Sequence, residues 1–162
     1  HPFISSKSKK LRVPHPEILP IQFEENAQFK RIAITVDFSD KDQKTISRAL
    51  TTGGKKSSYL LIHVVESAGA IFMERDIADL ESGTDTENLK RYTEALTKQG
   101  YQVTYELGFG RRSKVIPKAV KQFNADLLVM GTHGHRGLKD LLFGETINAV
   151  RHKIGIPLLA VK

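Results

Sequence analysis

The sequence predicts a doubly wound α/β fold, with a five-stranded parallel sheet of strand order 3-2-1-4-5 and helices on both faces. Two observations predict it. Stretches with apolar residues at helical spacing separate five short β-prone runs, at residues 32–36, 59–65, 101–107, 127–130 and 158–161. Strands that alternate with helices indicate βαβ units with right-handed crossovers, and hence a parallel sheet. Ligands of such sheets bind beyond the carboxyl ends of the strands, where the strand order reverses.

The first two strands are predicted from continuous apolar runs. Ile32–Val36 and Tyr59–Val65 have the composition of strands that are buried on both faces. Between them, Ser39 is predicted to cap a helix, with Asp42 as its capping-box partner. The glycine pair that starts at Gly53 is predicted to end this helix.

The third strand and the helix after it show different patterns. Tyr101–Leu107 alternates between apolar and polar residues, which predicts a strand nearer an edge of the sheet. An apolar stripe from Val115 to Phe123 predicts the helix. Pro117 is expected within the first turn of this helix, where a missing N–H costs little.

Composition indicates one domain. The chain has 162 residues, of which 40% are apolar and 27% charged. The absence of cysteine excludes a disulfide scaffold and thiolate zinc sites. A net charge of +7 favours anionic partners, but the sequence shows no interleaved basic and aromatic stripe, so no nucleic-acid partner is predicted. No apolar run approaches the roughly 20 residues that span a bilayer and no signal peptide opens the chain, which predicts a cytoplasmic location.

Residues 1–28 are predicted to form a basic leader and residues 29–162 the folded domain. Pro14, Pro16 and Pro20 punctuate the leader, and its basic residues cluster at Lys7, Lys9, Lys10 and Arg12. Such a segment cannot build a core of its own. Two interpretations stay open: a solvated tail, or a tether near an anionic membrane surface.

A glycine-containing loop carries the main functional prediction. The run 127–130 is followed by Gly131, Gly134 and Gly144, with a helical pattern after them. Glycines between a buried strand and a helix expose backbone N–H groups to an anion, so the loop is predicted to hold phosphates. Asp37 ends the first strand beside this loop, where a carboxylate suits the ribose or base of a nucleotide. The alternative is that Asp37 is a helix-entry residue that accepts bonds from backbone amides.

The histidines do not predict a metal site or a catalyst. His133 and His135 are too few ligands without a thiolate, and are expected to be polar neighbours of the anion. His63 is expected to be a core histidine with its hydrogen bonds satisfied. The sequence contains no serine elbow, Walker lysine motif or zinc-helix motif. No catalytic residue is predicted, and at most slow ATP hydrolysis is expected.

Together these segments resemble the universal stress protein family. Gly131-x-x-Gly134, nine residues and then Gly144 match the family's ATP-binding pattern. The segments VDFSD (36–40), LLIHVVE (60–66), LLVMGTHG (127–134) and IPLLAV (156–161) are also similar. The resemblance covers residues 29–162.

This resemblance implies a Rossmann-like regulatory domain that binds ATP, AMP or ADP with Mg²⁺, and that forms a homodimer through its last strand. It implies that Asp37 contacts the ribose or the base edge and that the backbone of Val64 meets adenine. The phosphates would be wrapped by the glycine loop. The implied set of binding residues is Thr35, Asp37, Val64, Gly131, Thr132, Gly134, Gly144, Glu145 and Thr146.

One position departs from the family pattern. Glu145 follows Gly144, where the family carries Ser or Thr. A carboxylate there repels a phosphate unless a divalent metal bridges them or the side chain points away. Thr146 is next and can supply the hydroxyl. The rival hypothesis is a dimerisation scaffold of the same fold that binds no nucleotide.

The family also occurs as a cytosolic appendage of membrane transporters, including metal-ion transporters of the Nramp type. The basic leader, and the start at His1 in place of Met, are consistent with such an attachment. The sequence therefore predicts a cytosolic domain joined to the membrane portion of a transporter.

Overall fold

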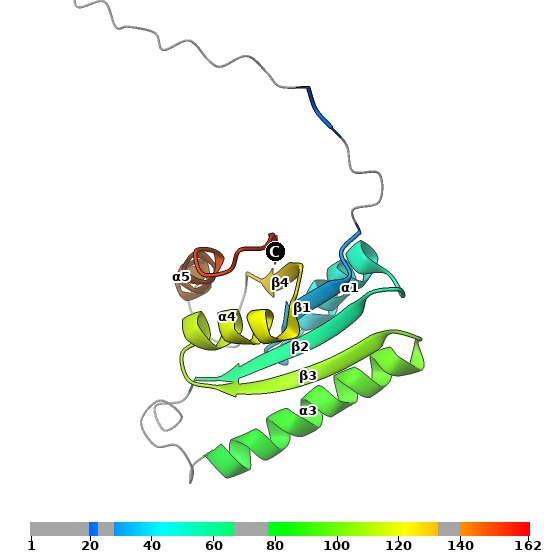
Figure 1. Cartoon of the computed structure of the whole chain (residues 1–162). Helices are drawn as coiled ribbons and strands as arrows, with labels where there is room; N and C mark the ends of the chain where they lie inside the picture. The colour runs from blue at the N-terminus through cyan, green and yellow to red at the C-terminus, as the bar shows by residue number, and fades with distance from the viewer. Residues whose placement is uncertain (1–19, 23–27, 67–77, 133–139) are drawn as a thin grey trace, which may run out of the picture.

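A five-stranded parallel sheet forms the centre of the computed structural model, which describes residues 20–22, 28–66, 78–132 and 140–162. The strand order is β3-β2-β1-β4-β5, and every neighbouring pair is parallel (Figure 1). This confirms the fold class and strand order predicted from the sequence. Along the chain the elements are β1 Arg31–Thr35, α1 Asp42–Gly53, β2 Ser58–Val65, α3 Ala78–Lys98, β3 Gln102–Phe109, α4 Arg112–Phe123, β4 Leu127–Gly131, α5 Asp140–Arg151 and β5 Leu158–Val161.

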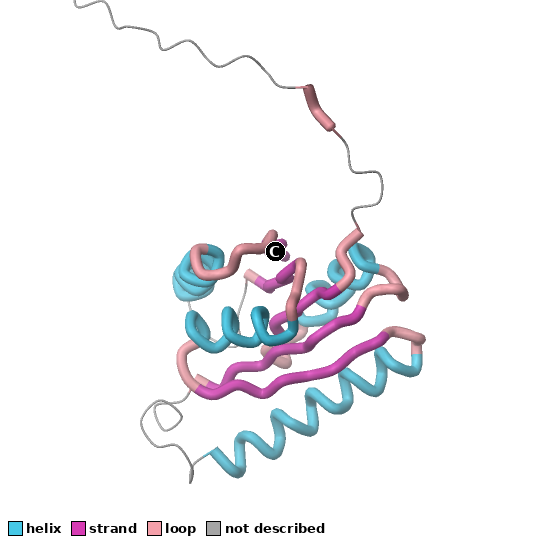
Figure 2. Tube along the Cα trace, in the orientation of Figure 1, coloured by secondary structure: helices cyan, strands magenta, loops and turns pink. Residues whose placement is uncertain are grey.

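Helices cover both faces of the sheet (Figure 2). Ile34 of β1 belongs to a buried cluster that contains side chains of α1 and α3. Its neighbour Ala33 belongs to a second cluster, with side chains of α4 and α5. Successive residues of the strand therefore point into different cores, which explains why β1 and β2 are apolar throughout.

The two edge strands differ from the central ones. β3 lies at one edge, and its alternating sequence leaves only Gly108 fully buried. β5 lies at the other edge and exposes Leu159, which is 36% accessible. The expectation that the third strand lies at an edge is confirmed. Within the four described ranges, no helix combines the length and apolarity needed to cross a membrane.

The start of α1 differs from the prediction. The helix begins at Asp42, and its N-cap residue is Lys41, which makes no side-chain cap bond. Ser39 instead accepts a hydrogen bond from the Lys41 N–H (3.3 Å) in the preceding turn. Asp42 still reaches backward, because its carboxylate accepts bonds from the N–H groups of Asp37 and Phe38. The prediction that Ser39 caps the helix was therefore wrong. Asp42 nevertheless accepts backbone N–H groups that precede the helix, as the acid of a capping box does.

Pro117 lies deeper in α4 than predicted. It is the sixth residue of the helix, so the Ser113 carbonyl four residues earlier has no helical N–H to accept. The Lys153 ammonium, beyond the end of α5, donates to that carbonyl at 2.9 Å. A side chain from the neighbouring connection thus replaces the missing helical bond and links α4 to the segment before β5.

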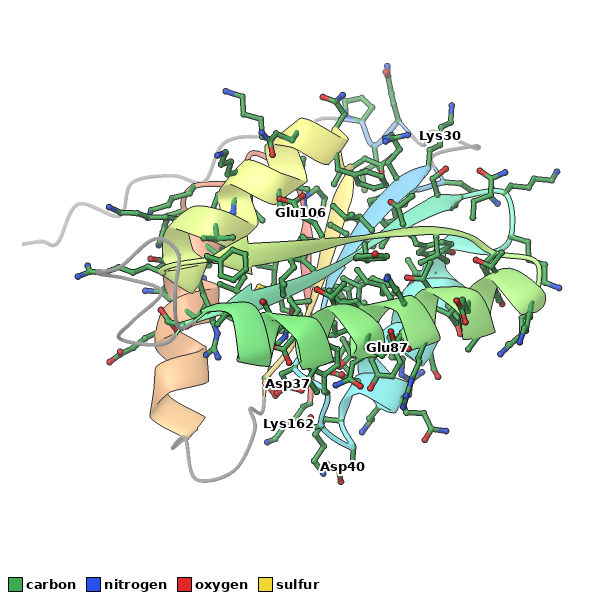
Figure 3. The ribbon with its side chains drawn as sticks, turned by 90° about the horizontal axis from the view of Figure 1, so that it is seen from below. Lys30, Asp37, Asp40, Glu87, Glu106 and Lys162 are labelled. Atoms are coloured by element: carbon green, nitrogen blue, oxygen red, sulfur yellow. The ribbon has the colours of Figure 1, made fainter. Side chains whose placement is uncertain are left out.

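The reversal in strand order lies between β1 and β4. From β1 the chain proceeds to β2 on one side, and from β4 it proceeds to β5 on the other. Figure 3 shows Asp37 and Asp40 at the end of the sheet where Lys162 lies, with Lys30 at the opposite end. The carboxyl ends of the strands therefore meet at the edge of the sheet where the sequence analysis predicted that a ligand binds.

Candidate functional site

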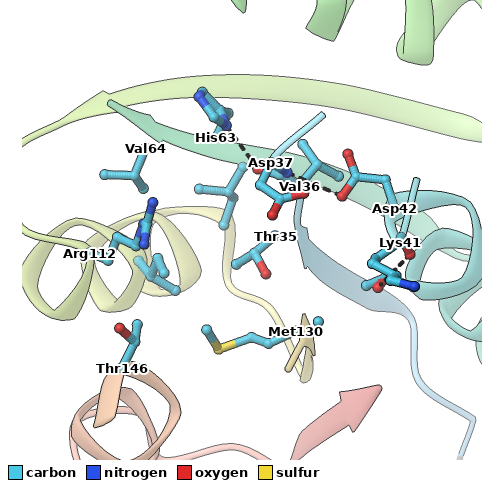
Figure 4. A pocket seen from close by; sticks show the side chains of 14 residues that line it. Thr35, Val36, Asp37, Lys41, Asp42, His63, Val64, Arg112, Met130 and Thr146 are labelled. Atoms are coloured by element: carbon cyan, nitrogen blue, oxygen red, sulfur yellow. Dashed lines mark hydrogen bonds between the residues drawn. The ribbon is translucent and has the colours of Figure 1, made fainter. Parts of the chain in front are cut away.

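A cavity lies at the carboxyl ends of β1, β2 and β4, where the strand order reverses. Its cavity volume is about 40 Å³, and it opens to solvent. Figure 4 shows its lining side chains. They come from the three strands, the turn before α1, and helices α1, α4 and α5: Thr35, Val36, Asp37, Lys41, Asp42, Thr45, Ile62, His63, Val64, Arg112, Ile116, Met130, Gly131 and Thr146.

The two carboxylate oxygens of Asp37 differ in their hydrogen bonding. Oδ1 accepts a hydrogen bond from the Ser39 N–H at 3.1 Å, which is the helix-entry role. Oδ2 is buried and has no hydrogen-bond partner within the part of the chain that the structure describes. A buried acceptor without a donor costs about 1–3 kcal/mol. Both interpretations of Asp37 are therefore compatible, with one oxygen for each.

Asp42 is a second carboxyl group at the floor of the cavity, and it is only 4% exposed. Its oxygens accept bonds from the Asp37 N–H (3.1 Å), the Phe38 N–H (2.7 Å) and the Tyr92 hydroxyl (3.1 Å). Burial raises the pKa of Asp42 to about 7. The backbone donors of Asp37 and Phe38 lower this pKa, whereas the negative charge of Asp37 and a side-chain hydrogen bond with Asp37 raise it further. Burial, reinforced by the charge of Asp42, also raises the pKa of the Tyr92 hydroxyl.

His63 forms part of the wall, and its ring nitrogens both have partners. Nδ1 lies 2.8 Å from the Val36 carbonyl oxygen, and Nε2 lies 3.3 Å from Asp85 Oδ2. The ring of Phe38 packs on the imidazole, with centroids 4.4 Å apart. Phe38 has a positive φ of 62°, a conformation that is uncommon for a residue of its size. The prediction of a satisfied core histidine is confirmed, and the same ring lines the cavity.

Val64 directs its backbone toward the cavity. The Val36 N–H donates to the Ile62 carbonyl at 2.9 Å, so residue 62 faces β1. Residues two apart on a parallel strand direct their backbone groups to the same side. The pairing of β1 with β2 ends at Thr35, so the backbone of Val64 faces the space beyond β1. Thr35 and Met130 also line this space (Figure 4).

The expected phosphate-binding residues are distributed differently from the sequence prediction. Gly131 lines the cavity at the end of β4. The Thr132 N–H donates to the Val161 carbonyl at 2.9 Å, whereas its Oγ1 is buried without a partner in the described structure. Gly134 lies outside the described residues, as do His133 and His135. Elsewhere in the described ranges, no group of three acidic or histidine side chains is placed to hold a metal ion.

The last three expected residues lie inside α5. Because α5 begins at Asp140, the expectation that a helix starts after Gly144 was wrong. The N–H groups of Gly144, Glu145 and Thr146 lie beyond the four that a helix leaves without partners. Thr146 lines the cavity, whereas Glu145 is exposed and lines a neighbouring groove.

Arg112 is one of the lining residues that the sequence analysis did not assign to the site, and it is positively charged. It is the first residue of α4 and follows a glycine, Gly110, whose φ is +115°. Its Nε lies 3.6 Å from Glu66 Oε2, and its backbone N–H donates to Glu66 Oε1 at 3.3 Å. The signal in the sequence was the pair Arg111 and Arg112, directly after the glycine that follows the third strand. Residues between a strand and the next helix lie at the ligand-binding edge of such a sheet.

The sequence of this chain has known relatives. A family model described as the universal stress protein family matches residues 28–162. Universal stress protein A homolog 1 of Coxiella burnetii is 33% identical over 140 residues, which cover 82% of this chain and 96% of the relative. The chain belongs to the universal stress protein family. The resemblance of the sequence motifs is thereby confirmed.

Solved universal stress proteins share this fold. The universal stress protein UspA from Lactobacillus plantarum superposes with a TM-score of 0.68 at 18% identity, and the match covers 85% of this chain and all (100%) of that one. A universal stress protein in complex with cAMP superposes with a TM-score of 0.64 at 16% identity, over 84% and 99% of the two chains. At these identities the likeness establishes the fold alone.

Proposed function

We propose that this universal stress protein domain binds an adenine nucleotide, ATP or its relatives AMP and ADP, in the cavity at the carboxyl ends of β1, β2 and β4. The observation that carries the proposal is Asp37 Oδ2, a buried acceptor that has no donor among the described residues. A ribose hydroxyl or an amino group of the base supplies such a donor. The solved family member in complex with cAMP supports the choice of an adenine nucleotide.

The remaining lining suits the other parts of a nucleoside. Ile62, Ile116 and Met130 give the cavity apolar walls for the faces of a purine. The backbone of Val64 offers hydrogen bonds to the purine edge. The hydroxyl of Thr146 and the backbone of Gly131 lie on the side from which phosphates would extend. Mg²⁺ accompanies those phosphates when ATP is bound, as their charge requires.

The proposed role is regulatory. Asp42, the carboxyl group with a pKa of about 7, accepts hydrogen bonds from two backbone N–H groups and from Tyr92, so both of its carboxyl oxygens are already engaged. Ligand occupancy, rather than turnover, is therefore the expected output of the site.

Ligand binding to the purified protein tests this proposal directly. We expect adenosine and Mg-ATP to raise the melting temperature, because a ligand at 100 times its Kd stabilises the folded state by about 2.7 kcal/mol. Asp37→Asn should weaken adenosine binding about 10-fold or more, since an amide NH₂ replaces the free acceptor. Asp40→Asn is the matched control, because Asp40 is 85% exposed and does not line the cavity. If neither ligand shifts the melting temperature, the scaffold hypothesis is favoured.

We also propose that two copies pair through β5. This strand hydrogen-bonds β4 on one side, and its other edge has no partner strand within the described sheet. Such an edge is a template for a second chain. Leu159→Lys should convert a dimer into a monomer in light scattering, because Leu159 is the exposed large apolar residue of β5. A dimer that persists in this variant contradicts pairing through β5.

Attachment to a membrane transporter remains a proposal that rests on the basic leader. The cluster at residues 7–12 lies outside the described residues, so its support is the sequence alone. Vesicles that contain phosphatidylserine should retain the full chain at low salt and release it at high salt. A variant with the four basic residues replaced by glutamine should not bind, whereas equal retention of both proteins contradicts the tether.

A further inference from the structure

The nucleotide cavity continues into a second depression between α4 and α5. This groove has a volume of about 440 Å³ and is open to solvent. Its lining residues are Glu66, Arg111, Arg112, Ser113, Glu145, Thr146 and Ala149. Arg112 and Thr146 line both spaces, so they form the boundary between them. In Figure 4 these two side chains lie at the end of the cavity away from Asp42.

The charge at this boundary is unusual for the start of a helix. The first turn of α4, residues 112–115, contains Arg112 and Lys114 and no carboxylate, and Arg111 precedes it. Cations are disfavoured at the positive end of a helix dipole. Glu66 approaches Arg112 at 3.6 Å and accepts its backbone N–H at 3.3 Å. Among the residues that line the groove, the carboxylates of Glu66 and Glu145 therefore face the cations Arg111 and Arg112 and the positive end of the helix dipole.

The environment of Arg112 strengthens its interaction with anions. Its side chain is 24% exposed, and that of Glu66 is 33% exposed. A partly buried guanidinium interacts more strongly with a nearby charge than one on an open surface. The contact with Glu66 involves Nε, which fixes the direction in which the planar group extends.

On the opposite wall, α5 contributes no cation to this groove. Glu145 and Thr146 face it with a carboxylate and a hydroxyl, and their N–H groups belong to the helix. In the described part of the site, Lys41 lines the cavity, whereas the cations that line the groove, Arg111 and Arg112, lie at the start of α4.

We propose that Arg112 is the residue that makes this site selective for nucleotides with a phosphate chain, and that it directs the phosphates into the groove between α4 and α5. The inference rests on the proposed adenine-nucleotide site. A guanidinium presents several N–H donors in a planar fork and binds two phosphate oxygens at once. Arg112 also offsets the repulsion that Glu145 introduces where the family carries a hydroxyl residue.

Three ligands separate the base from the phosphates: adenosine, ATP and inorganic tripolyphosphate. With the full chain, we expect Arg112→Gln to weaken ATP and tripolyphosphate binding about 10- to 100-fold in isothermal titration. Adenosine binding should change less than about 2-fold, which also shows that the variant is folded. Arg112→Lys should recover part of the loss, because it restores the charge without the fork.

Lys114→Gln is the matched control. It removes one positive charge from the same helical turn, and Lys114 is exposed and lines neither space. We expect it to leave the binding of all three ligands within about 2-fold of the parent protein. A loss equal to that of Arg112→Gln would show that overall charge, and not Arg112, is responsible, and would overturn the inference.

The remaining outcomes separate this inference from the proposed function. If the parent protein binds adenosine and ATP equally, or if Arg112→Gln weakens both to the same degree, the role of Arg112 is refuted and the adenine site stands. If the parent protein binds tripolyphosphate through Arg112 but does not bind adenosine, the phosphate groove stands and the adenine proposal fails. If it binds none of the three ligands, both are refuted.

Discussion

Replacing Asp42 by asparagine tests whether the floor of the cavity carries a proton near neutral pH. Asp42 is 4% exposed, and burial raises the pKa of its carboxyl group from 3.8 to about 7. The folded protein therefore keeps a proton that the unfolded chain releases above about pH 4. The contribution of Asp42 to the free energy of unfolding is fully present below the pKa of its carboxyl group in the unfolded chain. It is lost as the pH rises through the pKa of that group in the folded protein.

The size of the effect follows from these two pKa values. Between pH 5 and pH 7 the loss in the free energy of unfolding from Asp42 is about 2 kcal/mol. Asparagine cannot ionise. The free energy of unfolding of Asp42→Asn should therefore fall by about 2 kcal/mol less than that of the parent protein between pH 5 and pH 7. Asp40→Asn removes an acid that is 85% exposed and should follow the parent protein.

Urea unfolding at pH 5, 6 and 7 measures these free energies in all three proteins. Groups far from Asp42 contribute equally to the three proteins, so the comparison isolates Asp42 together with the neighbouring carboxyl group of Asp37. Parallel pH profiles for the parent protein and Asp42→Asn would refute a proton on Asp42.

Two further predictions concern the packing around the site. Lys153→Met should lower the free energy of unfolding by about 1 kcal/mol, because the Ser113 carbonyl loses its donor. In chemical denaturation the loss should shrink when it is combined with Pro117→Ala, which restores a helical N–H, and an unchanged loss would argue against this bond. Gly108→Ala should destabilise the domain by about 1–3 kcal/mol, because the new methyl group meets Val115 Cγ1. Gly144→Ala has open space around it and should be neutral or stabilising in thermal melts, so equal losses for the two variants would contradict this account.

The fold was predictable because each element depends on local patterns. The continuous runs of β1 and β2 require burial on both faces, and the alternation in β3 requires an edge. With the strand order 3-2-1-4-5, the position of Asp37 after the first strand places it at the reversal in strand order. Five of the nine residues predicted for the site line one cavity: Thr35, Asp37, Val64, Gly131 and Thr146.

The rest depended on tertiary arrangement. Arg112 follows the third strand, and only the crossover that brings α4 beside α5 places it next to Thr146. Asp42 was interpreted through a local capping rule, but it also accepts a hydrogen bond from Tyr92, fifty residues away in α3. The start of α5 was misplaced because glycines suggested a helix boundary, whereas Gly144 has open space around it within the helix.

The hydrogen bond from the Thr132 N–H to the Val161 carbonyl has a consequence for communication across the molecule. It joins the residue that leaves β4 at the proposed site to the final residue of the edge strand β5. The Oγ1 of the same threonine is buried without a partner in the described structure. A ligand that forms a hydrogen bond with this Oγ1 would contact a residue that is itself hydrogen-bonded to β5, the strand proposed to pair two copies. Linkage is reciprocal: if nucleotide changes the dimer dissociation constant by some factor, dimerisation changes nucleotide affinity by the same factor. The effect of nucleotide on dimer dissociation and the effect of dimerisation on nucleotide affinity can be measured independently.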